Sequence, residues 1–206
     1  MPGANRATRE THGRQLTPHP YNKTMSTLSP QSHTLKDDNT LHIRTAVAAD
    51  AGAILDHVHA VSAESDYLNF GPGEFTLTEA QEADYLASCE TADNQLYIMG
   101  LLDGQVVSTL NFTAGRRARV RHSGEFSLSV RQAYWGLGIG GFMMGALIDW
   151  AKTHQIAKIN LRVRADNGRG VALYEHKGFA IEGTLRREIV IAGEYFDHYW
   201  MGLLLG

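Results

Sequence analysis

The sequence predicts an α/β domain built on a mixed, mostly antiparallel central sheet of about seven strands with flanking helices. Two apolar runs are joined by Asp103-Gly104, a strong signal for a type I′ hairpin turn. Residues 126–130 and 158–164 alternate apolar and polar side chains, and a strongly apolar helical segment at 141–153 lies between them, as in a β-α-β unit. A second hairpin closes the chain and turns at Ala192-Gly193.

The remaining elements follow from periodicity and capping signals. Residues 41–47 predict a first strand, and apolar residues at helical spacing within 54–61 predict a helix that opens at about residue 48. A second helix is expected from Thr78, where Thr-x-x-Gln resembles a capping box. A short helix at 169–177 should end at Gly178. The expected order is therefore β-α-α-β-β-β-α-β-α-β-β.

The first 40 residues have a different composition from the rest of the chain. They hold four of the five prolines and almost no aliphatic side chains. Such a segment buries too little surface to offset its ordering entropy. We therefore expect a disordered tail at 1–40 and one domain at 41–206, with Met25 left open as an alternative start.

Composition and charge narrow the class of protein. A net charge of −3 gives no reason to expect a nucleic-acid partner. The single cysteine, Cys89, excludes an internal disulfide and fits a reducing compartment. We find no signal peptide, and the apolar runs fall far below the ~20 residues that cross a bilayer. We expect a cytoplasmic protein with no membrane partner, and no metal because no ligand-spaced His or Cys cluster is present.

The segment YWGLGIGG, residues 134–141, places four glycines directly before the apolar helix. Gly136, Gly138 and Gly141 satisfy the G-x-G-x-x-G dinucleotide fingerprint, but three other strands precede the strand that leads into it, and only 40 residues follow Asp166. The remaining parallel strands of a dinucleotide fold have no room. A flexible turn would need only one or two glycines. Glycines at a helix start let several backbone N–H groups converge on an anion, so this segment predicts a pyrophosphate site.

The chain from about Leu41 to Leu205 resembles the GNAT superfamily of acyl-CoA-dependent N-acetyltransferases. Three segments carry the resemblance in the family's order: HSGEFSLSVRQAYWGLGIGGFMMGALIDWA, LRVRADNGRGVALYEHKGF and EGTLRREIVIAGEYFDHYWMGLL. The last is similar to the closing hairpin of the branch that includes ribosomal-protein and small-amine acetyltransferases. Two positions depart from the pattern. Trp135 stands where many members have Arg or Gln, and Leu137 where a basic residue is frequent, which puts one phosphate contact in question.

The resemblance implies a cofactor site in which the strand at 126–130 splays from the strand at 158–164 and the pantetheine arm of acetyl-CoA inserts between them. Backbone groups near Val130 would hold the arm and polarise the thioester carbonyl. The implied cofactor-binding residues are Leu128, Ser129, Val130, Trp135, Gly136, Leu137, Gly138, Ile139, Gly140, Gly141, Asn167 and Tyr174. Packing in the strand is the alternative role for Ser129 and Val130, and helix capping is an alternative or additional role for Asn167.

The resemblance also implies two catalytic roles. Tyr174 matches the family tyrosine that directs its hydroxyl at the cofactor sulfur as general acid, although a tyrosine at this helical position could also be core packing. Strand alternation places Glu125 on the face opposite Phe126, where a carboxylate could take the amine proton. Ordered water, or Glu74 in the loop that commonly shapes the acceptor site, is the alternative base.

The expected reaction is direct transfer of the acetyl group of acetyl-CoA to a primary amine, with no covalent enzyme intermediate. The alternative is a non-catalytic acyl-CoA-binding or sensing module on the same fold. The acceptor is not encoded: peptide N-termini, polyamines, amino acids and other small amines all remain open. The apolar end WMGLLL leaves a homodimer open, and the arginine run 116–121 is expected to be solvated loop charge, with recognition of an acidic acceptor as the alternative.

Overall fold

The computed structural model describes residues 26–206, which form one eight-stranded sheet in the order β1-β2-β3-β4-β5-β6-β8-β7. The strands are β1 Gln31–Thr34, β2 Thr40–Thr45, β3 Gln95–Leu102, β4 Gln105–Ala114, β5 Ser123–Val130, β6 Lys158–Arg164, β7 Ala180–Ile191 and β8 Glu194–Leu204. The helices are α1 Ala51–Glu64, α2 Glu79–Thr91, α3 Ile139–Thr153 and α4 Gly168–His176, with short 3-10 turns η1 Ala48–Asp50 and η2 Gln132–Tyr134. Neighbouring strands are antiparallel except β5 and β6, which are parallel. The predicted fold class is confirmed.

The local signals in the sequence produce the expected turns and caps. Both predicted hairpin turns have two consecutive residues at positive φ, 49° and 79° at Asp103-Gly104 and 49° and 84° at Ala192-Gly193. Thr78 N-caps α2 by accepting a hydrogen bond from the Gln81 N–H, and the Gln81 side chain completes the capping box. Gly178 follows α4 at a φ of 91°. These elements could be predicted because a few neighbouring residues determine each of them.

The prediction of a disordered tail up to residue 40 was wrong in its last part. Residues 1–25 lie outside the described residues, but Gln31–Thr34 form β1 and pair antiparallel with β2. Leu35, which follows the strand, is 4% exposed and belongs to the core. A short edge strand satisfies its backbone by pairing with its neighbour and needs few aliphatic side chains of its own. This strand is the eighth, beyond the seven expected.

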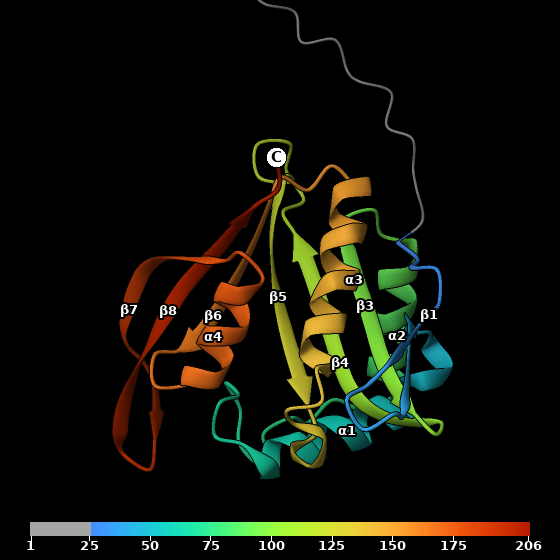
Figure 1. The fold of residues 1–206 in the computed structure, drawn as a ribbon, viewed down its shortest axis with the longest axis horizontal. Coiled ribbons are helices and arrows are strands. Elements are labelled where there is room, and N and C mark those ends of the chain that lie inside the picture. The colour runs from blue at the N-terminus through green and yellow to red at the C-terminus, as the bar shows by residue number, and fades with distance from the viewer. Residues whose placement is uncertain (1–25) are drawn as a thin grey trace, which may run out of the picture.

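The sheet is covered on both faces (Figure 1). Helices α3 and α4 lie on one face, and α1 and α2 lie on the other. The larger apolar cluster joins α3, through Met143, Met144 and Leu147, to one face of the sheet. A smaller cluster joins Ile54 of α1 and Leu86 of α2 to the opposite face. The half of the sheet that contains β5, β6 and β8 therefore has the α4 face packed and the α1 face less covered.

Candidate active site

The parallel strands β5 and β6 diverge along their length. They pair only through Ser123 with Lys158, Gly124 with Ile159 and Glu125 with Asn160. Beyond Glu125, β5 continues to Val130 paired only with β4, and β6 continues to Arg164 paired only with β8. The two facing edges therefore carry backbone groups with no strand partner. This is the expected splayed pair, and it opens toward the start of α3 (Figure 1).

The backbone of Val130 faces this opening. The next residue, Arg131, donates its N–H to the carbonyl of Val107 at 3.0 Å on the β4 side. Because backbone groups alternate direction along a strand, the N–H and C=O of Val130 point away from β4. The carbonyl accepts a hydrogen bond from the indole Nε1 of Trp135 at 2.7 Å. The Val130 N–H is the donor that this arrangement leaves facing the gap.

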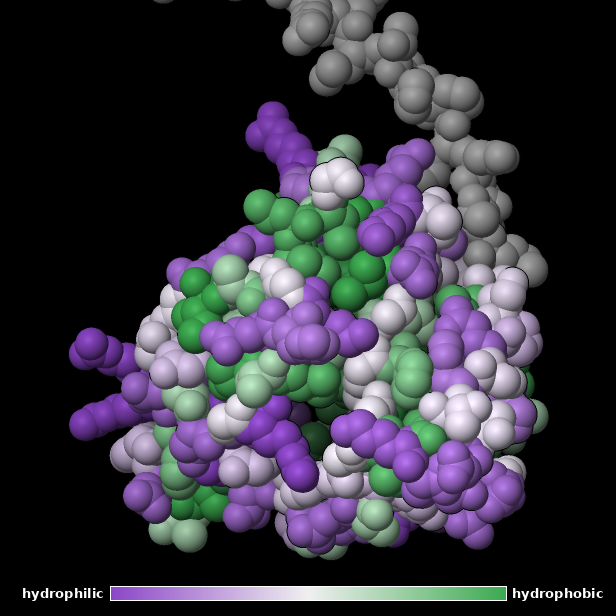
Figure 2. All heavy atoms as spheres, viewed as in Figure 1, coloured by the Kyte–Doolittle hydropathy of each residue, from purple (hydrophilic) through white to green (hydrophobic). Residues whose placement is uncertain are grey.

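The glycine segment makes the turn from β5 into α3. Gly136 and Gly138 have φ values of 88° and 97°, in the left-handed region, and Gly138 is the N-cap of α3. The first intrahelical bond runs from the Phe142 N–H to the Gly138 carbonyl. The N–H groups of the three residues at 139–141 therefore have no intrahelical acceptor, and they carry the positive end of the helix dipole. Figure 2 shows a hollow with hydrophobic atoms at its base on this side of the molecule.

Tyr174 of α4 packs beside the splayed strands. Its ring meets Phe126 of β5 edge-on at 6.0 Å between centroids and lies 6.1 Å from the ring of Phe179. Burial raises the pKa of Tyr174 to about 12. Within residues 26–206 the hydroxyl makes no hydrogen bond. The ring is thus held by packing, while the hydroxyl stays protonated at neutral pH and is available to donate.

Asn167 caps α4. Its side-chain Oδ1 accepts a hydrogen bond from the Gly170 N–H at 2.9 Å. The capping role considered from the sequence is confirmed, and it uses only the oxygen of the amide. A contact between Asn167 and the cofactor stays a prediction.

Glu125 lies on the face predicted for it, opposite Phe126, but it is not isolated. Its two carboxylate oxygens accept hydrogen bonds from Nε and Nη2 of Arg162 at 2.9 and 3.3 Å. The third nitrogen of Arg162, Nη1, lies 3.2 Å from Glu188 of β7. Both carboxylate oxygens of Glu125 are therefore already hydrogen-bonded to Arg162, and its role as base stays a prediction. Glu74 accepts from the Gly71 N–H within its own loop at 2.7 Å.

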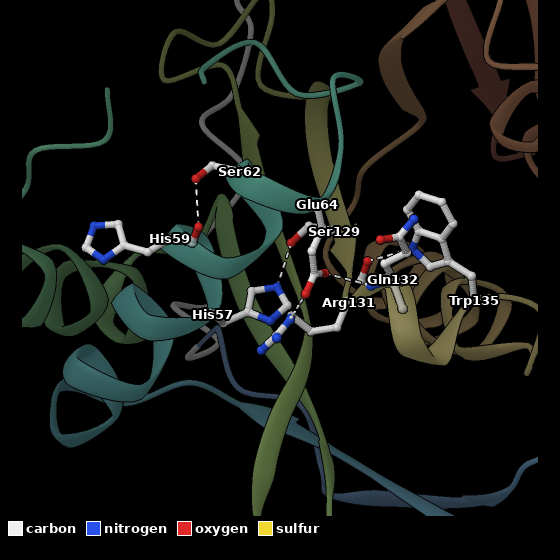
Figure 3. A network of polar contacts seen from close by, with 9 residues as sticks. His57, His59, Ser62, Glu64, Ser129, Arg131, Gln132 and Trp135 are labelled. Atoms are coloured by element: carbon white, nitrogen blue, oxygen red, sulfur yellow. Dashed lines mark hydrogen bonds and ion pairs between the residues drawn. The ribbon is translucent and has the colours of Figure 1, made fainter. Parts of the chain in front are cut away.

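A buried histidine on the α1 side, His57, is not among the site residues predicted from the sequence. His57 is 1% exposed, and its Nε2 lies 2.8 Å from Oγ of Ser129, which in turn lies 3.0 Å from Oγ1 of Thr109. In Figure 3, His57 points at β5 and His59 points away from it. The available signal was the position of His57 in the apolar stripe of α1, between Ile54 and Val61.

The last residue of α1 clamps the segment that leads from β5 to the glycine turn (Figure 3). Oε1 of Glu64 pairs with Nε of Arg131 at 2.8 Å, and Oε2 accepts the backbone N–H of Gln132 at 2.7 Å. Burial raises the pKa of the Glu64 carboxyl, but the hydrogen bonds from Gln132 and Arg131 outweigh burial and lower the pKa overall. Helix α1 therefore holds the backbone on both sides of Val130.

The buried state of His57 predicts a pH-dependent stability. Burial lowers the pKa of His57 from 6.5 to about 4. Between these values the unfolded chain binds a proton that the folded protein does not, so stability falls as the pH falls through this window, by up to about 3 kcal/mol. We expect His57→Gln to lose less stability than the wild type between pH 6.5 and 4 in urea unfolding. Parallel losses in the two proteins would show that His57 does not titrate this way.

Other candidate features do not lie at the site. The arginine loop joins β4 to the first residue of β5, at the end of the strand away from Val130, and Arg121 pairs there with Asp93 at 3.0 Å. Recognition of an acidic acceptor by this loop does not fit its position. Over residues 26–206, no three His, Cys, Asp or Glu side chains gather as a metal site would need. None of the helices in the same range combines the length and the apolar character needed to cross a membrane.

A model of the acetyltransferase (GNAT) family matches residues 62–179, more than half of the chain. The chain belongs to the GNAT acetyltransferase family. The match contains the splayed end of β5, the glycine turn, Asn167 and Tyr174, so the family-defining segment is the one that builds the site. The protein is therefore an acyltransferase of the GNAT type.

Two characterised relatives are similar to this GNAT protein. The L-amino acid N-acetyltransferase AaaT of Escherichia coli K12 is 30% identical over 129 residues, which cover 61% of this chain and 80% of the relative. The spermidine N(1)-acetyltransferase of Vibrio cholerae is 33% identical over 79 residues, 38% of this chain and 46% of the relative.

Solved structures share the fold. A GNAT acetyltransferase from Streptococcus pneumoniae superposes with a TM-score of 0.78 at 32% identity, over 81% of this chain and 99% of that one. A phosphinothricin acetyltransferase from Sinorhizobium meliloti, solved in complex with acetyl-CoA, superposes with a TM-score of 0.71 at 21% identity, over 84% and 90%.

Proposed function

We propose that this GNAT protein transfers the acetyl group of acetyl-CoA directly to a primary amine of a small-molecule or peptide acceptor. The observation that carries the proposal is the divergence of β5 and β6 beside the glycine start of α3. That arrangement puts an unpaired strand edge next to a set of helix N-terminal N–H groups. A long cofactor with an amide-containing arm and a pyrophosphate needs both.

The residues of the site fit this cofactor. The edge of β5 at Leu128 and Val130 would pair with the pantetheine amides, and the N–H groups of 139–141 would bind the pyrophosphate. A Cβ on Gly140 would lie 3.0 Å from Cδ2 of Leu173, so glycine there lets α3 and α4 approach closely next to the cradle. The complex of the Sinorhizobium relative with acetyl-CoA supports the choice of cofactor.

The chemistry assigned to the chain is polarisation and proton donation. When bound, acetyl-CoA supplies a thioester whose carbonyl carbon accepts the amine. The N–H of Leu128, which faces the same gap two residues before Val130, would polarise that carbonyl by donating a hydrogen bond to its oxygen, while the Val130 N–H pairs with the pantetheine arm. The Tyr174 hydroxyl would donate to the departing sulfur. Glu125 or a water would take the amine proton, and the ion pair of Glu125 with Arg162 supports the water.

The proposal predicts amine-dependent release of the CoA thiol by the full chain. We would first titrate thermal stability with acetyl-CoA, CoA and NAD, and then follow thiol release with a panel of primary amines. Stabilisation by both CoA species together with amine-dependent release would support the enzyme. Binding without release for any amine would favour the non-catalytic acyl-CoA module, and the absence of binding would contradict the proposed site.

A further inference from the structure

The face of the sheet that bears the candidate base Glu125 carries one arginine between two carboxylates. Arg162 of β6 pairs with Glu125 of β5 and with Glu188 of β7 on the face opposite α4. The side chains are 47%, 37% and 36% exposed, so solvent and a ligand can reach all three. Two negative groups share one positive group, which leaves this cluster with a surplus negative charge.

The next arginine along β6 is already committed. Arg164 is 7% exposed at its side chain, binds both oxygens of Asp166 and the carbonyl of Asp66, and lies over the ring of Phe196 at 3.9 Å. Its guanidinium is used to hold the loop after α1 against β8. His198 of β8, opposite Arg164 in the strand register, is 8% exposed and burial lowers its pKa, so it adds no charge at neutral pH.

The loop that Arg164 holds is itself acidic. Residues 65–78 contain Asp66 and Glu74 and no Lys, Arg or His. The Asp66 carbonyl contact places the start of this loop at the same end of β6 as the splay. The loop therefore adds negative charge near the face that bears Glu125 and Arg162, and it offers no cation to a ligand.

We propose that the acceptor is a diamine or polyamine, which carries a second ammonium group and no carboxylate. The proposal rests on the acetyl transfer proposed above. The carboxylate of a free amino acid would meet the surplus negative charge and find Arg162 and Arg164 occupied. A second ammonium would instead complete the pairing of Glu188 with a cation of its own. Arg186 and Arg187, both exposed on β7 and without an ion pair among the described residues, are the groups that an acceptor carboxylate would have to use.

Three amines with the same carbon chain separate these alternatives. Cadaverine has two terminal amines, L-lysine has the same amines plus a carboxylate, and pentylamine has one amine. We expect kcat/KM for cadaverine to exceed that for lysine and for pentylamine by about tenfold each, since like charge at a site of this kind is strongly unfavourable. The preference should weaken as salt is added because the cluster is exposed.

Glu188→Gln tests the residue that carries the preference. We expect it to lower kcat/KM for cadaverine by about fivefold, the upper range for an exposed pair, and to change pentylamine by less than about twofold. Asp149→Asn is the matched control, since it changes the net charge equally on the exposed surface of α3, away from this face, and should alter neither amine.

The outcomes separate the two proposals. A kcat/KM for lysine equal to or higher than that for cadaverine would overturn the inference and would indicate that an arginine of β7, such as Arg186, binds the carboxylate. Pentylamine equal to cadaverine, or an unchanged preference in Glu188→Gln, would overturn it as well, while leaving acetyl transfer intact. No thiol release with any of these three amines, while another primary amine of the panel is acetylated, would overturn this inference alone; no release with any amine of the panel, despite acetyl-CoA binding, would refute the proposed function and this inference with it.

Discussion

Tyr174→Phe should lower kcat by about a hundredfold while leaving the affinity for acetyl-CoA within about twofold of the wild type, since a positioned general acid contributes about 10²–10⁴. The substitution removes only the hydroxyl. The ring contacts with Phe126 and Phe179 that hold α4 against β5 remain. The hydroxyl makes no hydrogen bond within the described residues, so folding loses little when it is removed.

The high pKa of Tyr174 sharpens this test. Burial raises it to about 12, so the phenol stays protonated across the usual assay range. A thiol has an ordinary pKa of about 8.5, so in the proposed mechanism Tyr174 would stabilise the departing thiolate mainly by donating a hydrogen bond. The kcat profile of the wild type should therefore show no titration of Tyr174 below about pH 10.

Steady-state thiol release and isothermal titration with acetyl-CoA measure the two halves of the prediction. A loss of affinity or of thermal stability as large as the loss of turnover would assign Tyr174 to packing. If Tyr174→Phe changes neither turnover nor affinity, Tyr174 is not the donor to the departing thiolate, and water has to supply the proton.

The sequence predicted the parts of the fold that depend on close neighbours. Asp103-Gly104 adopts two positive φ angles, as its local sequence predicts, and Gly178 after α4 does the same at one position. The glycine turn at 136–141 is also a feature that depends on close neighbours, because the local sequence determines both its backbone conformation and the N–H groups expected to bind an anion. Strand β1 does not, because its polar residues become a strand only through pairing with β2.

The contacts that shape the candidate site join residues far apart in sequence. Glu125 and Arg162 are 37 positions apart, and His57 and Ser129 are 72 apart. Each pair meets only when the sheet register and the position of α1 are fixed, so no spacing rule identifies it. The indole of Trp135 on the Val130 carbonyl is only five residues distant, yet it depends on the path of the turn between them. The contact of Trp135 with the cofactor stays a prediction, and its indole N–H is bonded to the strand edge.

The second large effect is expected for Gly138→Val, which should raise the Kd for CoA by at least about a hundredfold. Gly138 is the N-cap of α3 at a φ of 97°. Valine in the left-handed region costs about 1–2 kcal/mol, and its branched Cβ makes this conformation a genuine outlier. A side chain here also stands where the N–H groups of 139–141 have to meet a phosphate.

Packing does not account for this effect. A Cβ on Gly138 would approach only Cε2 of Phe142, at 3.6 Å, which is an ordinary contact. Gly145, in the middle of α3 with nothing within 4 Å of an added Cβ, provides the matched control. Gly145→Ala should gain about 0.5–1 kcal/mol of stability and leave CoA affinity unchanged.

Thermal unfolding with and without CoA separates strain from lost binding. Gly138→Val should unfold a few degrees earlier than the wild type and show no further rise with CoA, whereas Gly145→Ala should keep the full rise. A Gly138→Val protein that is destabilised but still rises with CoA would show that the glycine serves the turn alone. The anion would then be held elsewhere, and the assignment of the pyrophosphate to the start of α3 would have to be abandoned.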